Sequence, residues 1–257
     1  MSSSHILKWL SASALASLSL IAVADDDAGV TPYRPSVSSP AQLPLPGQLE
    51  LEMGLLSSKQ GNARRDSLPY QLKLAFNPQW GILIGGEAVV SARDDSGNRA
   101  RGIGDTTLVL KRAFLIDDSS ALGLEFGIKT PTAKDSIGSG KTDYSINGIY
   151  SQDIGKVHMD ANLNFVHLGI ADPGTSSTQT GLSASFSTPI ADKWGATAEL
   201  SGTHRSGSDN TSQILAALAY SPSNRMTIDF GVAKGLNKAS PDLSLFTGIV
   251  LPLGRLW

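Results

Sequence analysis

The sequence predicts an all-β fold: a transmembrane antiparallel β-barrel of about 12 strands, of the type found in the bacterial outer membrane. Three observations lead to this prediction. Segments of about ten residues alternate between apolar and polar side chains, which is typical of strands with one lipid face and one lumen face. The connectors between these segments are alternately short and long, and aromatic side chains gather beside the short ones.

The composition excludes several other classes of protein. The chain has 257 residues, a formal net charge of −2 and 17% charged residues. This near-neutral balance argues against a nucleic-acid binder, which needs a basic face. The chain contains no Cys, so a disulfide scaffold, a thiolate zinc site and a Cys nucleophile are excluded. A mean hydropathy of −0.04 does not fit a bundle of membrane helices.

Residues 1–24 have the pattern of a cleavable secretory signal peptide. A weakly basic start is followed by an apolar stretch, Leu10 to Val23, which ends at Ala22-Val23-Ala24. An Ala-x-Ala ending after a short apolar region is typical of a signal-peptide cleavage site. The alternative is a short membrane anchor, but about 14 apolar or small residues are too few to span the hydrocarbon core comfortably. We therefore expect a mature chain that begins near Asp25 and is exported to the outer membrane.

Residues 25–47 form a Pro-rich leader before the first alternating segment. Proline cannot donate to a strand ladder and interrupts a helix, and the leader contains Pro32, Pro35, Pro40, Pro44 and Pro46. We expect an extended periplasmic leader that lies outside the main fold, followed by a barrel domain at residues 48–257. The acidic run Asp25–Asp27 is interpreted as a solvated terminus rather than a metal site.

The first half of the barrel domain contains five alternating segments. Each has apolar residues on the face expected to meet lipid and polar or small residues on the face expected to line the lumen. The lipid faces are, in order, Leu49, Leu51, Met53 and Leu55; Tyr70, Leu72, Leu74 and Phe76; Trp80, Ile82 and Ile84, running on to Val90; Leu108, Leu110 and Phe114; and Leu122, Leu124, Phe126 and Ile128.

The second half continues the alternation through seven further segments. One of them is unusual because its other face, with Leu215 and Ala217, is also apolar. The lipid faces are Tyr144, Ile146 and Tyr150; Met159, Ala161, Leu163 and Phe165; Leu182, Ala184 and Phe186; Trp194, Ala196, Ala198 and Leu200; Ile214, Ala216, Leu218 and Tyr220; Ile228, Phe230 and Val232; and Leu243, Leu245, Thr247 and Ile249.

The connectors alternate in length along the chain. An even number of strands with short turns at one end and long loops at the other is typical of outer-membrane barrels, whose short turns are periplasmic. The expected long loops are residues 57–68, 91–102, 131–142 and 169–179, with medium loops at 205–211 and 235–241. The expected short turns are residues 77–79, 115–120, 152–156, 189–193 and 221–225.

Aromatic residues mark the predicted membrane interfaces, because amphipathic rings prefer the headgroup level. Tyr70 and Tyr144 are candidates for a sparse girdle at the long-loop end. The chain ends on Trp257, in phase with Leu253 and Leu251, which resembles the C-terminal signal that the outer-membrane assembly machinery recognises. The girdle beside the short turns comprises Phe76, Trp80, Phe114, Tyr150, Trp194 and Tyr220.

A secreted soluble β-sandwich would also alternate, but its outer face should carry many Lys and Glu residues. Here the polar faces are rich in Gly, Ser, Thr and Asn, which suits a wet lumen.

Two short motifs, Ser139 to Thr142 and Gly102 to Gly104, resemble phosphate-binding and dinucleotide-binding loops. Neither precedes a predicted helix, so both are interpreted as connectors.

An outer-membrane lipid hydrolase is one alternative function, because some barrels of this kind are phospholipases. His167 lies on the apolar face near the long-loop end, where a catalytic histidine could stand. No Ser and Asn partners stand out for it, and His158 and His204 are interpreted as solvated residues at strand ends. We therefore expect no catalytic residue, no cofactor and no metal site.

Charged and amide side chains on the polar faces are the candidate lumen-lining residues, because charges are expensive in lipid. Glu52 and Lys73 lie on consecutive segments, as do Lys111 and Glu125, so cross-strand ion pairs are expected. Such charges could fill the barrel as ion pairs or form a polar filter, and the sequence leaves both open. The candidates are Glu52, Lys73, Glu87, Asp105, Lys111, Glu125, Lys129, Asp160, Asn162, Asn164, Glu199 and Asp229.

Several short motifs occur together over the mature chain. They are Pro35-Ser36-Val37, Gly47-Gln48-Leu49-Glu50-Leu51-Glu52, Gly102-Ile103-Gly104-Asp105 leading to Leu110-Lys111, Lys129-Thr130-Pro131-Thr132, Gly138-Ser139-Gly140-Lys141-Thr142-Asp143 and Asp160-Ala161-Asn162-Leu163-Asn164. With these motifs the chain resembles the outer-membrane transporter family associated with the meta-cleavage pathway of phenol degradation. The resemblance implies an outer-membrane β-barrel of Gram-negative bacteria that transports small aromatic or other hydrophobic molecules. It supplies no functional residues to carry over.

The expected function is that of an outer-membrane channel for the passive movement of small molecules. Twelve strands enclose more space than the eight-stranded barrel, whose interior side chains just fill it. A non-transporting structural or surface-interaction barrel, acting through its long loops, is the alternative, and a lipid hydrolase is a further one. The expected partners are the lipid bilayer, the assembly machinery through Trp257 and a small-molecule solute, with no nucleic acid.

Overall fold

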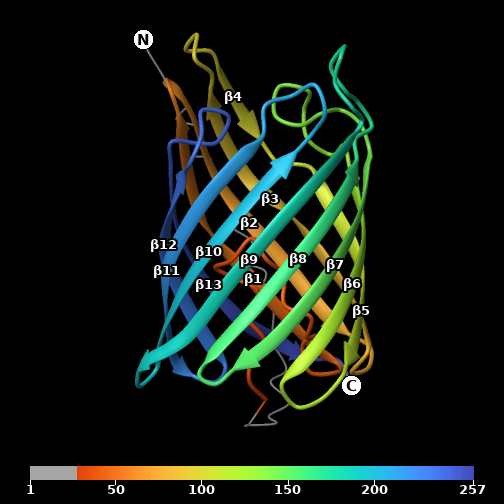
Figure 1. Ribbon diagram of the computed structural model, residues 1–257, viewed down its shortest axis with the longest axis vertical. Helices are drawn as coiled ribbons and strands as arrows, with labels where there is room; N and C mark the ends of the chain where they lie inside the picture. Colours follow the sequence, from red (N-terminus) through yellow and green to blue (C-terminus); the bar gives the residue numbers. More distant parts are fainter. Residues whose placement is uncertain (1–27) are drawn as a thin grey trace, which may run out of the picture.

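The computed structural model describes residues 28–257, which form a closed antiparallel β-barrel (Figure 1). Consecutive wall strands pair with each other, and β1 (Gln48–Gln60) pairs with β13 (Leu243–Arg255) to close the ring. No helix within these residues is long and apolar enough to cross a membrane. The predicted signal peptide at residues 1–24 and the acidic run Asp25–Asp27 lie outside the described residues.

Twelve strands form the barrel wall, as predicted, and one short strand extends a hairpin. This strand, β4 (Arg99–Gly102), pairs with the end of β3 (Trp80–Arg93), whose first half pairs with β5 (Thr106–Leu115). The other wall strands are β2 (Ala63–Ala75), β6 (Ser120–Thr130), β7 (Asp143–Ile154), β8 (Val157–His167), β9 (Thr178–Ala191), β10 (Trp194–His204), β11 (Thr211–Ser223) and β12 (Met226–Gly235).

The predicted lipid and lumen faces are confirmed along the wall. Apolar side chains on the outer face, such as Leu122, Leu163 and Leu200, are exposed, whereas Lys73 and Glu199 on the inner face are buried. Successive side chains of a strand point to opposite sides of the sheet. The exposure pattern therefore fixes which residues meet lipid and which face the barrel interior.

Val90 departs from this pattern, and its predicted outward position is wrong. Val89 is 56% exposed, whereas Val90 is fully buried. The ladder between β2 and β3 shifts between Ser67 and Pro69, whose partners are Val90 and Glu87. β3 therefore has one more residue than β2 in this interval, which is a β-bulge that turns Val90 inward.

The apolar inner face predicted on one segment belongs to β11. Leu215 and Ala217 pack against Ala233 of β12, and Phe246 of β13 packs against this cluster. A local patch of the barrel interior is therefore apolar, which explains why this strand is apolar on both faces.

Short turns and longer connections alternate along the wall, but the first two predicted long loops are wrong. Most of residues 57–68 and 91–102 instead extend the strands, with only 61–62 and 94–98 left as turns, and the β3–β4 hairpin rises beyond the barrel rim (Figure 1). β1 and β2 meet at a tight turn at Gly61, whose φ of 57° favours glycine. These hairpin ends are polar on both faces, so the alternation disappears although the ladder continues.

Aromatic rings gather at the short-turn end, as the girdle prediction requires. Trp194 of β10 packs on Tyr220 of β11, with ring centroids 4.9 Å apart. The guanidinium of Arg112 lies 4.7 Å from the Trp80 ring centroid and 4.9 Å from that of Phe114. A cation held against aromatic faces is stabilised by their quadrupoles, so Arg112 can stand on the outer face at this interface.

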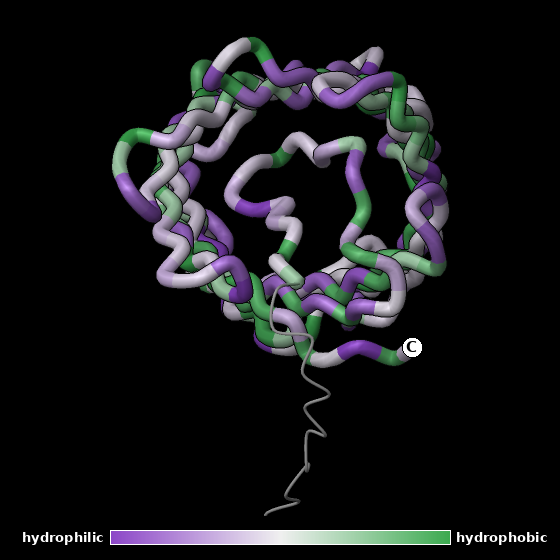
Figure 2. The backbone as a smooth tube through the Cα atoms, turned by 90° about the horizontal axis from the view of Figure 1, so that it is seen from below, coloured by the Kyte–Doolittle hydropathy of each residue, from purple (hydrophilic) through white to green (hydrophobic). Residues whose placement is uncertain are grey.

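The leader does not lie outside the main fold, and that prediction is wrong for residues 28–47. Figure 2 shows a loop of chain inside the ring of strands, and the hydrogen bonds of the leader reach inner-face side chains of the wall. The leader forms no helix or extended strand, as its prolines predict. An extended segment still has N–H groups that need partners, and the polar inner wall supplies acceptors for them.

Candidate functional site

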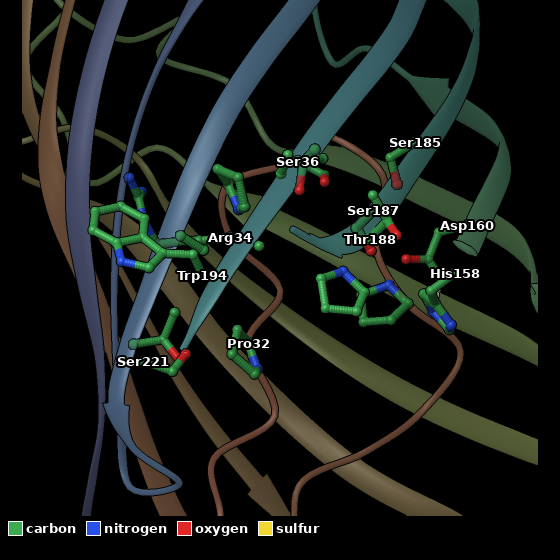
Figure 3. Close-up of a pocket in the computed structure, with 18 of the residues that line it drawn as sticks. Pro32, Arg34, Ser36, His158, Asp160, Ser185, Ser187, Thr188, Trp194 and Ser221 are labelled. Carbon is green, nitrogen blue, oxygen red and sulfur yellow. Dashed lines mark hydrogen bonds and ion pairs between the residues drawn. The ribbon is translucent and has the colours of Figure 1, made fainter. Parts of the chain in front are cut away.

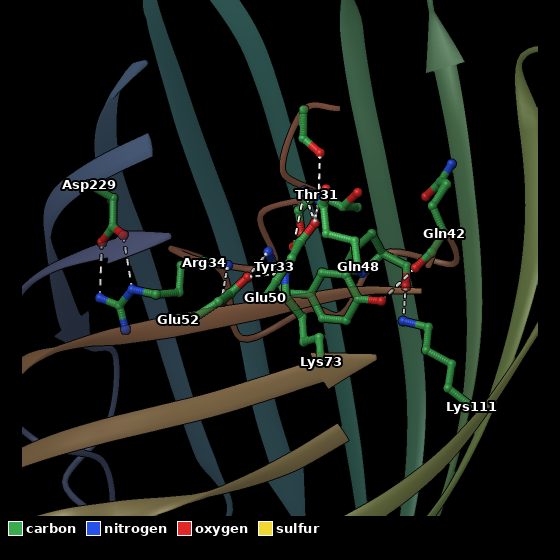
Figure 4. A network of polar contacts seen from close by, with 12 residues as sticks. Thr31, Tyr33, Arg34, Gln42, Gln48, Glu50, Glu52, Lys73, Lys111 and Asp229 are labelled. Carbon is green, nitrogen blue, oxygen red and sulfur yellow. Dashed lines mark hydrogen bonds and ion pairs between the residues drawn. The ribbon is translucent and has the colours of Figure 1, made fainter. Parts of the chain in front are cut away.

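Two glutamates of β1 hold the start of the leader inside the barrel (Figure 4). Glu50 accepts hydrogen bonds from the backbone N–H of Thr31, at 3.1 and 3.2 Å to its two oxygens. Glu52 accepts one from the backbone N–H of Tyr33 at 2.7 Å. Lys73 of β2 lies between the two carboxylates, with Nζ 2.9 Å from Glu50 and 2.6 Å from Glu52. Its ammonium also donates to the carbonyl of Thr31, so backbone and wall share one ionic cluster.

The ring of Tyr33 lies between two buried lysines. The ammonium of Lys73 is 4.3 Å from the ring centroid, and that of Lys111 on β5 is 4.1 Å from it. A cation over an aromatic face is attracted by the ring quadrupole, most strongly where water is excluded. The Tyr33 hydroxyl donates to the carbonyl of Gln42 at 2.6 Å. Lys111 also pairs with Glu125 of β6 at 3.1 Å, so its charge is balanced.

Arg34 joins the leader to β12. Its Nε and Nη2 donate to the two carboxylate oxygens of Asp229 at 2.9 and 3.0 Å. Two parallel contacts of this kind add geometric specificity as well as energy. The guanidinium lies against β1 at Gly54 and β13 at Gly248, and a Cβ at Gly248 would come 2.4 Å from its Nε. The missing side chain at Gly248 leaves the space that Arg34 occupies.

The middle of the leader is held through its backbone. Oε2 of Glu199 on β10 accepts hydrogen bonds from the N–H groups of Val37 at 2.8 Å and Ser38 at 2.9 Å. Asn162 of β8 accepts from the N–H of Ser39 at 2.8 Å and donates to its carbonyl at 2.9 Å. A buried N–H without a partner would cost free energy, so these two side chains fix the turn at residues 37–39.

A second group of inner side chains lies towards the short-turn end. Ser151 of β7 accepts a hydrogen bond from the N–H of Ala41 at 2.8 Å and donates to Asp160 of β8. His158 stands between two carboxylates, with Nε2 3.2 Å from Asp160 and Nδ1 2.6 Å from Asp153. The leader is therefore linked to this end of the wall as well.

Ion pairs at the long-loop end join wall residues to each other. Lys129 of β6 lies 2.6 Å from Asp143 of β7 and 3.4 Å from Asp105, which precedes β5. Glu87 of β3 forms a two-contact ion pair with Arg65 of β2. The cations of these pairs, Lys129 and Arg65, are partly exposed, in contrast to the buried Lys73 and Lys111 around the leader.

Eight of the twelve sequence candidates are buried in the barrel. Glu87, Asp105 and Lys129 form the ion pairs at the long-loop end, and Asn164 lines a cavity described below. Both expected cross-strand pairs are formed, Glu52 with Lys73 and Lys111 with Glu125. Sequence reasoning missed the partners that the leader provides, above all Tyr33 and Arg34. The signal for them is a charge imbalance, because the candidate set contains seven carboxylates and three lysines. The excess carboxylates bind N–H groups and Arg34 of the leader.

The leader leaves two cavities against the wall formed by β8 to β11. The inner cavity, of about 800 Å³, lies at the short-turn end, since residues of the β7–β8 and β9–β10 turns line it. The outer cavity, of about 450 Å³, lies towards the long-loop end and is lined by Asn147, Asn164 and Thr203. Figure 3 shows the leader residues Pro32, Arg34 and Ser36 facing Asp160, Ser185, Ser187 and Thr188 across the inner cavity.

The turn at residues 37–39 separates the two cavities. Ser36 lines the inner cavity, whereas Val37 and Ser39 line the outer one. Asn162 lines the outer cavity and also binds Ser39, and Glu199 binds the same turn from β10. A solute that passed along this wall would have to pass the turn that Glu199 and Asn162 hold.

The residues that lie opposite His167 in the strand ladder do not form a catalytic triad with it. His167 ends β8, opposite Tyr144 of β7 and Thr178 of β9. Neither partner is a carboxylate or an Asn, which a hydrolytic histidine would use for orientation. Within residues 28–257, no group of three or more His, Asp and Glu residues could hold a metal ion.

Comparisons with known proteins agree with this architecture. The NanC porin superimposes with a TM-score of 0.55 at 9% identity, covering 79% of this chain and 98% of that one. The KdgM porin in complex with disordered oligogalacturonate superimposes with a TM-score of 0.53, also at 9% identity and with the same coverage. The chain therefore has the fold of outer-membrane porins. No curated protein sequence matches it. The family model described as "Putative MetA-pathway of phenol degradation" matches residues 34–253, so the chain belongs to this family.

Proposed function

We propose that this protein is an outer-membrane channel for the passive movement of small molecules, with the leader as its constriction. The observation that carries the proposal is the pair of cavities on one side of the leader, with the turn of residues 37–39 between them. Both are lined by the same stretch of wall, so together they describe a path between the two ends of the barrel. The inner-face candidates, from Asp160 and Asn162 to Glu199, would shape this path.

The proposal includes the location and orientation of the barrel. The chain would be exported by the signal peptide at residues 1–24 and assembled into the outer membrane through its C-terminal Trp257. The short turns would be periplasmic and the long loops extracellular, as in other outer-membrane barrels. The exposed apolar belt and the aromatic girdle beside the short turns support the membrane location.

The lining favours small neutral molecules that carry a hydroxyl group. The inner cavity combines the hydroxyls of Ser185, Ser187 and Thr197 with the apolar rings of leader prolines. A phenolic molecule offers the same combination of a ring and a hydroxyl, which accords with the family description. The inner cavity is lined by charges of both signs, with Asp153 and Asp160 beside Arg34, Lys156 and Lys193, so its lining does not select for one sign of solute charge.

The test is the single-channel current of the refolded protein in a planar bilayer, together with the entry of neutral solutes of increasing size into vesicles. We expect a small current and entry of the smallest solutes. Ser185→Trp should reduce both by filling the inner cavity, whereas Ala184→Trp, the neighbouring residue on the outer face, should not. Absence of current and entry would mean a filled barrel, and the non-transporting alternative would then replace the channel.

A further inference from the structure

Four cations stand in one row across the first four strands at the long-loop end. Lys59 of β1 lies opposite Arg64 of β2, and Arg64 lies opposite Arg93 of β3. Arg93 in turn lies opposite Arg99 of β4. Neighbouring strands are about 4.8 Å apart, so the row places four positive side chains within about 15 Å. We refer to these four residues as the basic row.

The basic row faces outward, away from the lumen. Val89 is exposed and Val90 is buried on β3, so Arg93, two positions after Ser91, shares the outer face of Val89. On β2, Arg65 points inward to Glu87, and its neighbour Arg64 therefore points outward. All four side chains of the row are exposed.

The row stands just beyond the apolar belt of the barrel. The outermost apolar residues on these strands include Leu55, at 62% exposed, and Val89. One row of residues lies between these apolar residues and the basic row. In this intervening row, Ser57 lies opposite Asp66, Asp66 opposite Ser91, and Ser91 opposite Arg101. Lys59 and Arg93 lie four residues beyond Leu55 and Val89, which is about 13 Å along a strand and less along the barrel axis because the strands are tilted. The basic row therefore lies at the level of lipid headgroups.

The carboxylates nearby do not balance this charge. Like charges directly opposite each other destabilise a sheet, and the row contains three such contacts. Asp66 binds Arg64 at 2.9 Å through both oxygens. Asp95 accepts hydrogen bonds from the backbone N–H groups of Asn62 and Ala63, and Asp94 binds Asn98. These contacts leave an excess of positive charge for an anion outside the chain to neutralise.

The surface around the row is hollowed as well as charged. A hollow of about 430 Å³ is lined by all four members of the row and by Arg101, with Asp66 as the carboxylate of its lining. The amide of Asn62 and the hydroxyl of Ser91 also border it. Guanidinium groups bind phosphate oxygens in a bidentate manner, and several of them converge here.

We propose that the basic row binds the phosphate groups of lipopolysaccharide, the phosphorylated glycolipid of the outer leaflet. The proposal rests on the outer-membrane location proposed above. Two features favour a lipid over a free anion as the occupant. The row faces the lipid side of the wall, and the exposed side chains of Leu55 and Val89, beyond the intervening row, would contact the acyl chains of the same molecule.

The test compares lipid A that carries both phosphates with lipid A from which both have been removed, using the full-length mature protein in a neutral detergent. The affinity for each lipid is measured by titration. The variant R64Q/R93Q/R99Q removes three charges from the row. The control K141Q/K234Q/K238Q removes three exposed charges elsewhere at the long-loop end. The unfolding temperature of each variant without lipid shows whether it is folded.

We expect the wild type and the control to prefer phosphorylated lipid A by about tenfold or more, and R64Q/R93Q/R99Q to lose that preference. Without lipid, R64Q/R93Q/R99Q should unfold no earlier than the wild type, because the row repels itself. Equal binding of both lipids by the wild type, or equal losses in both variants, would overturn the proposal. Full displacement of the lipid by millimolar inorganic phosphate would show a free-anion site instead. Channel current is a separate measurement, so failure here leaves the proposed function standing.

Discussion

Arg34 of the leader and Asp229 of β12 form a two-contact ion pair inside the barrel, at 2.9 and 3.0 Å. The two residues are 195 positions apart in the sequence. Asp229 is 1% exposed, and Arg34 is 17% exposed. The pair therefore fixes the leader against a wall strand in a setting where a lone charge would be poorly solvated.

The first prediction concerns this pair. Arg34→Gln and Asp229→Asn should each lower the free energy of unfolding by about 2–3 kcal/mol, because each leaves its partner without a counter-charge. The double variant should lose less than the sum of the two, since no lone charge remains. Denaturant titration of the four proteins gives the coupling energy. Strictly additive losses would show that the two side chains do not stabilise each other.

The second prediction uses the space that a glycine leaves for Arg34. A Cβ at Gly248 would come 2.4 Å from Nε of Arg34, whereas a Cβ at Gly254 on the same strand meets nothing within 4 Å. Gly248→Ala should displace the guanidinium and loosen the leader. Gly254→Ala is the control. Hydrogen exchange of a peptide covering residues 37–41 should accelerate in Gly248→Ala alone, and equal exchange in both variants would contradict the packing described here.

The third prediction separates a buried charge from a partly exposed one. Glu125→Gln leaves the ammonium of Lys111, which is fully buried, without its carboxylate, and should cost about 3 kcal/mol of stability. Lys129 is 26% exposed at the long-loop end, so Lys129→Gln should cost about 0–1 kcal/mol. The free energy of unfolding of both variants tests this difference. Similar losses would mean that water reaches the leader cluster as easily as the long-loop end.

The fourth prediction concerns the two faces of the wall. Leu124 and Leu163 face lipid, and Arg at either position should cost roughly 2–4 kcal/mol. Ser185 borders the inner cavity, and an Arg there can extend into it at a much smaller cost. Refolding into lipid vesicles followed by denaturant titration measures all three. If the three losses were equal, the assigned faces would be wrong.

The wall could be predicted from the sequence because its physics is local. In a strand between lipid and a wet interior, apolar and polar side chains alternate residue by residue. This pattern correctly predicts the twelve wall strands and the inward positions of Lys73 and Glu199. The alternation fails where both faces are solvated, as at residues 57–68. It also fails where a bulge changes the phase of the alternation. The ladder shift that turns Val90 inward cannot be recognised from the types of the residues involved.

The leader could not be placed from the sequence because its position depends on contacts between distant residues. Its prolines correctly predict a segment without helix or strand. Whether such a segment lies outside or inside depends on acceptors that the wall supplies, and these come from Glu50 and Glu52 of β1, Asn162 of β8 and Glu199 of β10. The excess of carboxylates on the inner faces was the one visible sign that the lumen holds a donor-rich partner.

The central claim is that the leader turn held by Glu199 is the constriction of a channel. Its most direct test is the single-channel conductance of Glu199→Ala beside that of Thr197→Ala, an inward residue on the same strand that borders the inner cavity. Glu199→Ala removes the acceptor for the N–H groups of Val37 and Ser38, so the turn should loosen. We predict a clearly larger conductance for Glu199→Ala and a nearly unchanged one for Thr197→Ala. Equal conductance in wild type and Glu199→Ala, with the leader loosened as judged by hydrogen exchange, would contradict the claim.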